Sequence, residues 1–173
     1  MTDEHSPAGR PTPMATVMLL AGVVVFMAGF FGLFRLLGVQ PLCGLLFLVY
    51  WGAILHQERR AFVPAVLGGL GGILMSWLLL GLPPLVGQIG TVVSVVALAL
   101  LLFSFMRGQM RWAVNNSTML FLTVATIPEL HVGKNAVGMA ESLLLGAAYM
   151  GAVSAGAALV RSRMSRQPAE IAK

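Results

Sequence analysis

Apolar residues fill most of this chain in long stretches that short polar segments separate. Between residues 61 and 106 there are 46 residues without one Asp, Glu, Lys, Arg or His, and Pro83-Pro84 interrupts this stretch near its middle. A transmembrane helix needs about 20 apolar residues to cross a hydrocarbon core of roughly 30 Å. Because a proline pair is not expected to continue a helix, the stretch predicts two spans joined by a tight hairpin at the prolines.

The same pattern predicts six spans, at residues 16–34, 41–55, 61–82, 84–106, 112–128 and 135–160. The apolar run of the first span is longer than a signal-peptide core and lacks a cleavage pattern, so we expect it to stay in the protein. The predicted fold is all-α, a polytopic membrane bundle of six transmembrane helices. Residues 1–13 form a cytoplasmic tail, residues 14–160 the transmembrane domain, and residues 161–173 a basic cytoplasmic tail.

Composition and charge agree with this class. The chain has 58% hydrophobic and 10% charged residues, whereas soluble proteins carry about 25% charged residues. The net charge of +5 does not indicate a nucleic-acid partner, because the basic residues stand singly or in pairs at span ends. With both termini on one side, that side holds nine Lys and Arg residues and the other holds two. Since cytoplasmic loops are rich in Lys and Arg, we expect both termini in the cytoplasm of a bacterium, with the spans in its inner membrane.

An internal repeat is visible when the chain is shifted by 75 positions. Residues 45–76 then align with residues 120–151, and nine of 32 positions are identical, including His56 with His131. The shift places span two on span five and span three on span six, both short spans being repeat mates. Three spans per half make this a 3+3 inverted-topology repeat, a construction found in many transporters.

Small residues recur at four-residue spacing in three of the predicted spans. They allow helix backbones to approach closely, either within the bundle or between copies in a homo-oligomer. The ridges are Gly68, Gly72 and Ser76; Gly90 and Ser94; and Gly138, Ser142 and Gly146.

Polar side chains at membrane depth are the candidates for a substrate path. They are Asn115, Asn116, Ser117, Thr118 and Thr123 in span five and Glu141 in span six. Intramembrane polar and acidic groups are costly and mark pathways in many membrane proteins. Two other interpretations stay open: the polar run is a capping turn at the cytoplasmic interface, or Glu141 marks the outer interface of a span that begins after it.

A second group of charged residues is expected on the external side. Arg35, Glu129, His131 and Lys134 are candidates for an external vestibule that binds ions or senses pH, with a solvated loop as the alternative. The sequence has no metal-ligand spacing, no catalytic Ser/His/Asp arrangement and no phosphate-cradling loop, and Cys43 is its only cysteine. We therefore predict no enzyme activity, no cofactor and no metal.

The order of these features resembles a group of small bacterial inner-membrane proteins, the domain-of-unknown-function family numbered 1097. The resemblance covers residues 15–160 and includes the short aromatic span at 44–51, a polar loop, a glycine-rich span and closing spans rich in Thr, Ala and Gly. The Glu58-Arg59-Arg60 loop before a glycine-rich helix also resembles the membrane half of aromatic-acid and fusaric-acid exporters, which are longer chains.

These observations predict an inner-membrane transporter or channel for a small solute, acting as a homo-oligomer in the lipid bilayer. The alternative is a non-transporting membrane subunit or an assembly or scaffold protein of a larger complex.

Overall fold

The structure, a computed structural model, is a bundle of helices typical of a membrane protein. It describes residues 13–108, 110–127 and 136–171, with side chains up to residue 163. Four described helices are long and apolar enough to cross a membrane: α1 (Pro13–Leu36), α3 (Arg59–Val86), α4 (Gln88–Arg107) and residues Ala136–Arg163 of α7 (Ala136–Ile171). In this described part the regular structure is all helical, which confirms the all-α part of the predicted fold class.

Two shorter helices lie among the long ones. α2 (Leu42–Val49) continues into a π-helical turn, η1 (Tyr50–Ile54), and α5 (Asn116–Ala125) follows the end of α4. At about 1.5 Å per residue, the ten residues of α5 reach only about 15 Å, half of a hydrocarbon core. Each of these two segments is therefore too short to cross the hydrocarbon core as a helix on its own.

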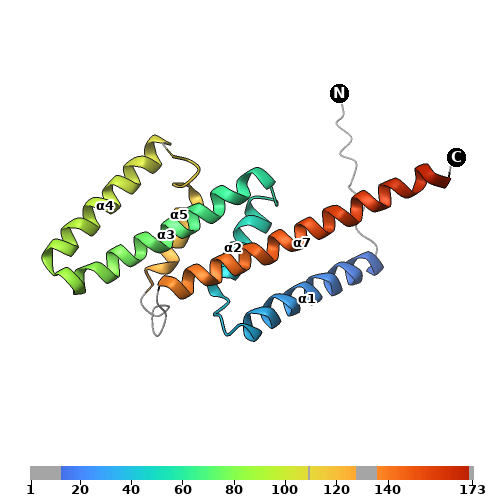
Figure 1. The fold of residues 1–173 in the computed structure, drawn as a ribbon, viewed down its shortest axis with the longest axis horizontal. Helices are drawn as coiled ribbons and strands as arrows, with labels where there is room; N and C mark the ends of the chain where they lie inside the picture. The colour runs from blue at the N-terminus through green and yellow to red at the C-terminus, as the bar shows by residue number, and fades with distance from the viewer. Residues whose placement is uncertain (1–12, 109, 128–135, 172–173) are drawn as a thin grey trace, which may run out of the picture.

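Successive helices run in opposite directions, and two contacts dominate the packing (Figure 1). α5 packs along α3, and α2 packs along α7, while α3 and α7 also touch each other. α4 contacts α3, and α1 contacts α7, so that α1 and α4 lie at opposite edges of the molecule. Each short helix thus packs on a long helix that is distant in sequence.

The core lies where α2, η1, α3, α5 and α7 meet. Phe47, Trp51, Phe121 and Leu143 are all at most 2% exposed in it. The aromatic rings meet edge-on, with Phe62 of α3 perpendicular to both Phe47 and Trp51 at centroid distances of 5.7 Å and 5.0 Å. Edge-to-face rings are a favoured arrangement, so these side chains hold α2 and η1 against α3.

All three predicted ridges of small residues serve contacts within the chain. A Cβ added at Gly146 would lie 2.5 Å from the Gly44 Cα, and one added at Gly72 would lie 2.5 Å from the Thr118 carbonyl oxygen. In the α3–α4 hairpin, a Cβ at Gly90 would lie 2.6 Å from the Leu82 carbonyl oxygen. Such backbone contacts give the van der Waals packing that replaces hydrophobic drive between membrane helices.

The predicted break at the proline pair is wrong. α3 continues through Pro83 and Pro84 to Val86, and the chain reverses at Gly87. The prolines lie in the last turn, so only the carbonyls of Leu79 and Leu80 lose their helical donors. Gly87 has φ +66° and ψ −140°, a conformation that only glycine adopts readily, and its N–H donates to the Pro83 carbonyl at 2.8 Å. The predicted hairpin is present, with glycine rather than proline at its bend.

Two predicted boundaries also differ from the structure. The span predicted at residues 112–128 contains a helix only from Asn116 to Ala125, because a turn precedes the Asn115 cap. The last helix extends to Ile171, well beyond residue 160, so most of the predicted C-terminal tail continues α7.

The edge helices differ in how firmly they are held. In α4 the Ser94 hydroxyl lies 2.6 Å from the Leu78 carbonyl of α3 and 2.8 Å from its own Gly90 carbonyl. In α1 the Phe26 carbonyl accepts from the Tyr149 hydroxyl of α7 at 2.7 Å, and the Tyr149 ring contacts those of Phe26 and Phe30. The buried Phe34 ring of α1 lies beside Gly44 of α2. Most other side chains of both helices are exposed, as lipid-facing helices require.

We predict that Gly146→Ala destabilises the bundle by about 1–3 kcal/mol, because its methyl group would collide with the backbone at Gly44. The midpoint of unfolding in mixed detergent and SDS measures this. Gly22→Ala is the matched control, since a Cβ at Gly22 of α1 meets nothing within 4 Å. Equal midpoints for the two variants would contradict the close approach of α2 and α7.

Candidate functional site

The polar run at the start of α5 forms a capping box. The Asn115 side-chain oxygen accepts a hydrogen bond from the Ser117 N–H at 2.9 Å, and the Thr118 hydroxyl oxygen accepts one from the Asn115 N–H at 3.1 Å. These bonds satisfy N–H groups that the first turn of a helix leaves without partners. This agrees with the capping interpretation of the run.

The same residues also attach α5 to α3. The Ser117 hydroxyl donates to the Ala65 carbonyl at 2.7 Å, and the Asn115 amide donates to the Pro64 carbonyl at 2.8 Å. The Thr118 hydroxyl donates to the Ala113 carbonyl at 2.9 Å, and both hydroxyl residues are fully buried. Gly68 makes room for the Asn115 side chain, which would overlap any Cβ placed there. The polar atoms of these three residues are therefore engaged in helix packing.

Two residues of the predicted path point elsewhere. Thr123 is exposed, and its hydroxyl donates to the Met119 carbonyl of its own helix at 2.8 Å. Asn116 is exposed and borders a hollow of about 380 Å³ between the end of α4 and the start of α5. The structure thus separates the residues that the sequence grouped in span five.

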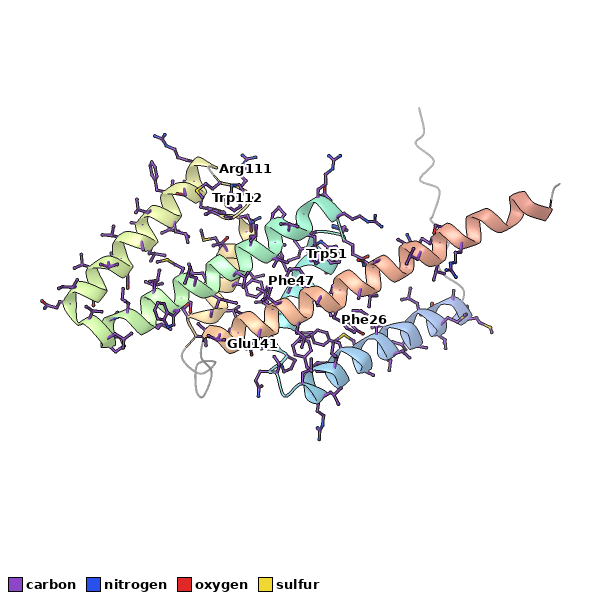
Figure 2. The ribbon with its side chains drawn as sticks, in the orientation of Figure 1. Phe26, Phe47, Trp51, Arg111, Trp112 and Glu141 are labelled. Carbon is purple, nitrogen blue, oxygen red and sulfur yellow. The ribbon has the colours of Figure 1, made fainter. Side chains whose placement is uncertain are left out.

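Glu141 is exposed and borders a different hollow, of about 240 Å³, where the α1–α2 connection meets the first turns of α7. Gly38, Gln40 and Ser142 are among its neighbours there. The Ser142 hydroxyl donates to the Gln40 carbonyl at 2.5 Å and accepts from the Gly44 N–H at 3.0 Å, so it fixes the start of α2 on α7. Figure 2 shows Glu141 and the Arg111–Trp112 segment well separated across the molecule.

Of the predicted external residues, the structure describes Arg35. It is exposed in the last turn of α1, close in sequence to the Leu37 and Gly38 that border the Glu141 hollow. Glu129, His131 and Lys134 lie outside the described residues. No group of three His, Cys, Asp or Glu residues lies together as a metal site in the described part of the chain.

A groove of about 490 Å³ runs between α3 and the second half of α7. Trp51, Arg59 and Phe62 border one side, and Gly151, Ser154 and Ala158 are among the small residues of α7 on the other. Leu143, Ala147 and Met150 lie along α7 between this groove and the Glu141 hollow, and each is at most 5% exposed. Both openings therefore border α7, and tightly packed side chains separate them (Figure 2).

Sequence reasoning missed two parts of this arrangement. The Ser142 hydroxyl bridges the start of α2 and α7. The sequence pattern indicates Ser142 only as a small residue of the Gly138–Gly146 ridge. Tyr50, Arg107 and Arg111 border the hollow beside Asn116, yet the sequence indicates both arginines only as topology signals. The 75-residue shift is a signal for the first part, because it pairs Gln40 with Asn115, which lie two residues and one residue before the two short helices.

Comparison of the chain with protein-family models, with curated proteins and with solved structures gives no match.

We predict that Asn115→Ala lowers the free energy of unfolding by about 1–2 kcal/mol, since it removes a helix cap and a bond to α3. Ser117→Ala should cost about 1 kcal/mol for the lost bond to Ala65. SDS unfolding of the purified protein measures both. Thr123→Ala is the control, because Thr123 is exposed and bonded within its own helix; a loss as large as that of Asn115→Ala would contradict the packing role.

Proposed function

We propose that the protein is a multi-pass membrane transporter for a small solute, built from two inverted halves, α1–α2–α3 and α4–α5–α7. One observation carries this proposal: the contacts between helices are reciprocal. α5 packs on α3 as α2 packs on α7, and α4 contacts α3 as α1 contacts α7. Exchange of the two halves maps these four contacts onto one another, as a pseudo-twofold axis in the membrane plane requires.

The bounds of the two short helices support the same relation. A shift of 75 residues carries Leu42 and Val49, the bounds of α2, to within one residue of Asn116 and Ala125, the bounds of α5. The shift in the sequence and the placement of these two helices therefore agree.

The proposed path follows α7 where it faces the first half. Its outer end is the Glu141 hollow and its inner end is the groove beside Trp51 and Phe62. Phe47, Leu143 and Met150 close it between these ends, so passage requires the halves to move relative to each other. Alternating access by such movement is the general behaviour of inverted-repeat transporters.

The proposed topology has six passes, with both termini in the cytoplasm of a bacterium and the bundle in its inner membrane. The excess of Lys and Arg at one end of the bundle supports this orientation. In this proposal the two short helices cross with the help of flanking chain, since non-helical backbone is tolerated where it lies against protein or a water-filled cavity. The exposed apolar faces of α1 and α4 are open to lipid or to further copies in a homo-oligomer.

We retain two further proposals from the sequence. The protein is not an enzyme, and it belongs with the small inner-membrane proteins of the domain-of-unknown-function family numbered 1097. The short aromatic helix α2 before the glycine-rich helix α3 supports this relationship.

A second candidate function is a non-transporting subunit or scaffold of a larger membrane complex. The packed interior favours it, since every buried side-chain nitrogen and oxygen among the described residues has a hydrogen-bond partner. In this case the exposed faces of α1 and α4 would contact other membrane proteins. Flux measurements separate the two candidates.

For the transporter, we predict that Glu141→Gln alters the rate of solute flux or its dependence on pH, because Glu141 is the acidic group at the outer end of the path. The measurement is uptake from a panel of small metabolites into liposomes that contain the purified protein. Glu58→Gln is the control, an exposed carboxylate at the start of α3. If the wild-type protein moves no solute, the subunit function is favoured; a silent Glu141→Gln in a working assay excludes its role.

For the topology, we predict that a periplasm-active phosphatase fused after Lys173 stays inactive, whereas a cytoplasm-active fluorescent reporter is bright. Fusions after Arg35 should show the opposite pattern, because one pass separates the two positions. High phosphatase activity at the C-terminus would exclude the proposed orientation.

A further inference from the structure

The hollow between α4 and α5 is lined by groups that bind anions. It is bordered by the end of α4, by the connection that follows, by the start of α5 and by Tyr50 of η1, and it encloses about 380 Å³. Two arginines line it, Arg107 and Arg111, together with the side chains of Asn115 and Asn116.

Neither arginine has an ion-pair partner among the described side chains. The acidic side chains described there are Glu58 and Glu141, and neither borders this hollow. Both guanidinium groups therefore border the hollow without a carboxylate partner there and are available to an anion.

Contacts with the protein direct both guanidinium groups. The Arg107 guanidinium lies over the Phe103 ring, 5.0 Å from its centroid. Arg111 folds back on Gly108, where an added Cβ would lie 3.1 Å from its Nε and Nη2 atoms. Gly108 ends α4 with φ +63°, so a larger residue there would be strained and would also displace Arg111. The end of α4 is thus shaped to hold the arginine side chain.

The start of α5 adds further positive potential. The dipole of α5 places partial positive charge at its N-terminus, which favours an anion nearby. The exposed Asn116 side chain, at the first position of α5, offers an amide donor to the hollow. These groups supplement the two arginines.

We propose that this hollow binds the phosphate group of an anionic phospholipid. Arginine pairs with phosphate oxygens through parallel hydrogen bonds, and basic pockets between membrane helices on the cytoplasmic side bind anionic headgroups. This inference holds for a transporter and for a subunit, because it does not depend on solute passage.

The surroundings favour a lipid over free phosphate. Met106 borders the hollow with 86% of its surface exposed, and Phe105 is exposed beside it. From there the exposed Val92, Val96, Leu100 and Phe103 continue along α4 as an apolar face. Trp112, 57% exposed, lies at the same end of the helix, where tryptophan collects at membrane interfaces. A phosphate in the hollow therefore lets acyl chains lie against α4.

The test uses the full-length protein, purified and stripped of lipid in a non-ionic detergent. Native mass spectrometry and thermal shift measure the binding of dioleoylphosphatidylglycerol, with dioleoylphosphatidylcholine as the zwitterionic lipid. We expect the anionic lipid to bind more tightly to the wild-type protein. Arg107→Gln with Arg111→Gln should weaken it by roughly tenfold or more, without change for phosphatidylcholine.

The matched control is Arg60→Gln with Arg163→Gln, which removes the same charge from residues that border none of the hollows described above. An equal loss in both double variants would overturn the site, because net charge alone would then explain it. If the double variant does not fold, the single variants and the charge-conserving Arg111→Lys carry the test. For Arg111→Lys we expect intermediate affinity.

A competition arm distinguishes the two sources of phosphate. Inorganic phosphate and glycerol phosphate at millimolar concentration should displace little lipid. If they bind with the same dependence on Arg107 and Arg111 and compete fully, the phosphate site stands but the lipid is overturned as its occupant.

Discussion

The bundle depends on backbone-to-backbone contact between each short helix and a long helix far away in the sequence. Gly44 meets Gly146 where α2 crosses α7, and Gly72 meets the Thr118–Leu122 turn where α5 crosses α3. In lipid, apolar side chains gain little by leaving their solvent, so association depends on how closely helices approach. The absence of side chains at these glycines therefore determines which helices pair.

Serine hydroxyl groups add hydrogen bonds to the helix crossings at which the glycines allow close approach. Ser117 and Ser142 each bond to a backbone carbonyl across the same crossings, and Ser76 bonds to the Ala125 carbonyl at the far end of α5. α5 is too short to place both of its ends in headgroup regions, so its terminal backbone groups need partners inside the protein. Serine supplies a partner without the bulk that would separate the helices, which explains its presence in glycine ridges.

Much of this arrangement is readable from the sequence. The absence of charge over 46 residues predicts the α3–α4 hairpin, and the spacing of Gly68, Gly72 and Ser76 predicts a packing face. Short sequence patterns do not predict helix ends and helix pairs that depend on residues elsewhere in the chain. Pro83 and Pro84 read as a break, yet they fit in a last turn because Gly87 makes the reversal. The sequence of the polar run is compatible with a substrate path and with a helix cap. Only the position of α3 shows which backbone groups its side chains bond. No short sequence pattern predicts that α2 packs on α7, because the bonds between these regions join residues 98 and 102 positions apart.

The long-range pairing also has a consequence for biosynthesis. α4 and α5 follow α3 closely in the chain and both contact it, so these three helices can associate as soon as α5 leaves the ribosome. α1 and α2 emerge first, but their main partner is α7, the last helix of the described chain. The N-terminal helices must therefore wait in the bilayer until almost the whole chain has been made. The hydrogen bond and ring contacts between Tyr149 and α1 likewise form only after α7 has been made.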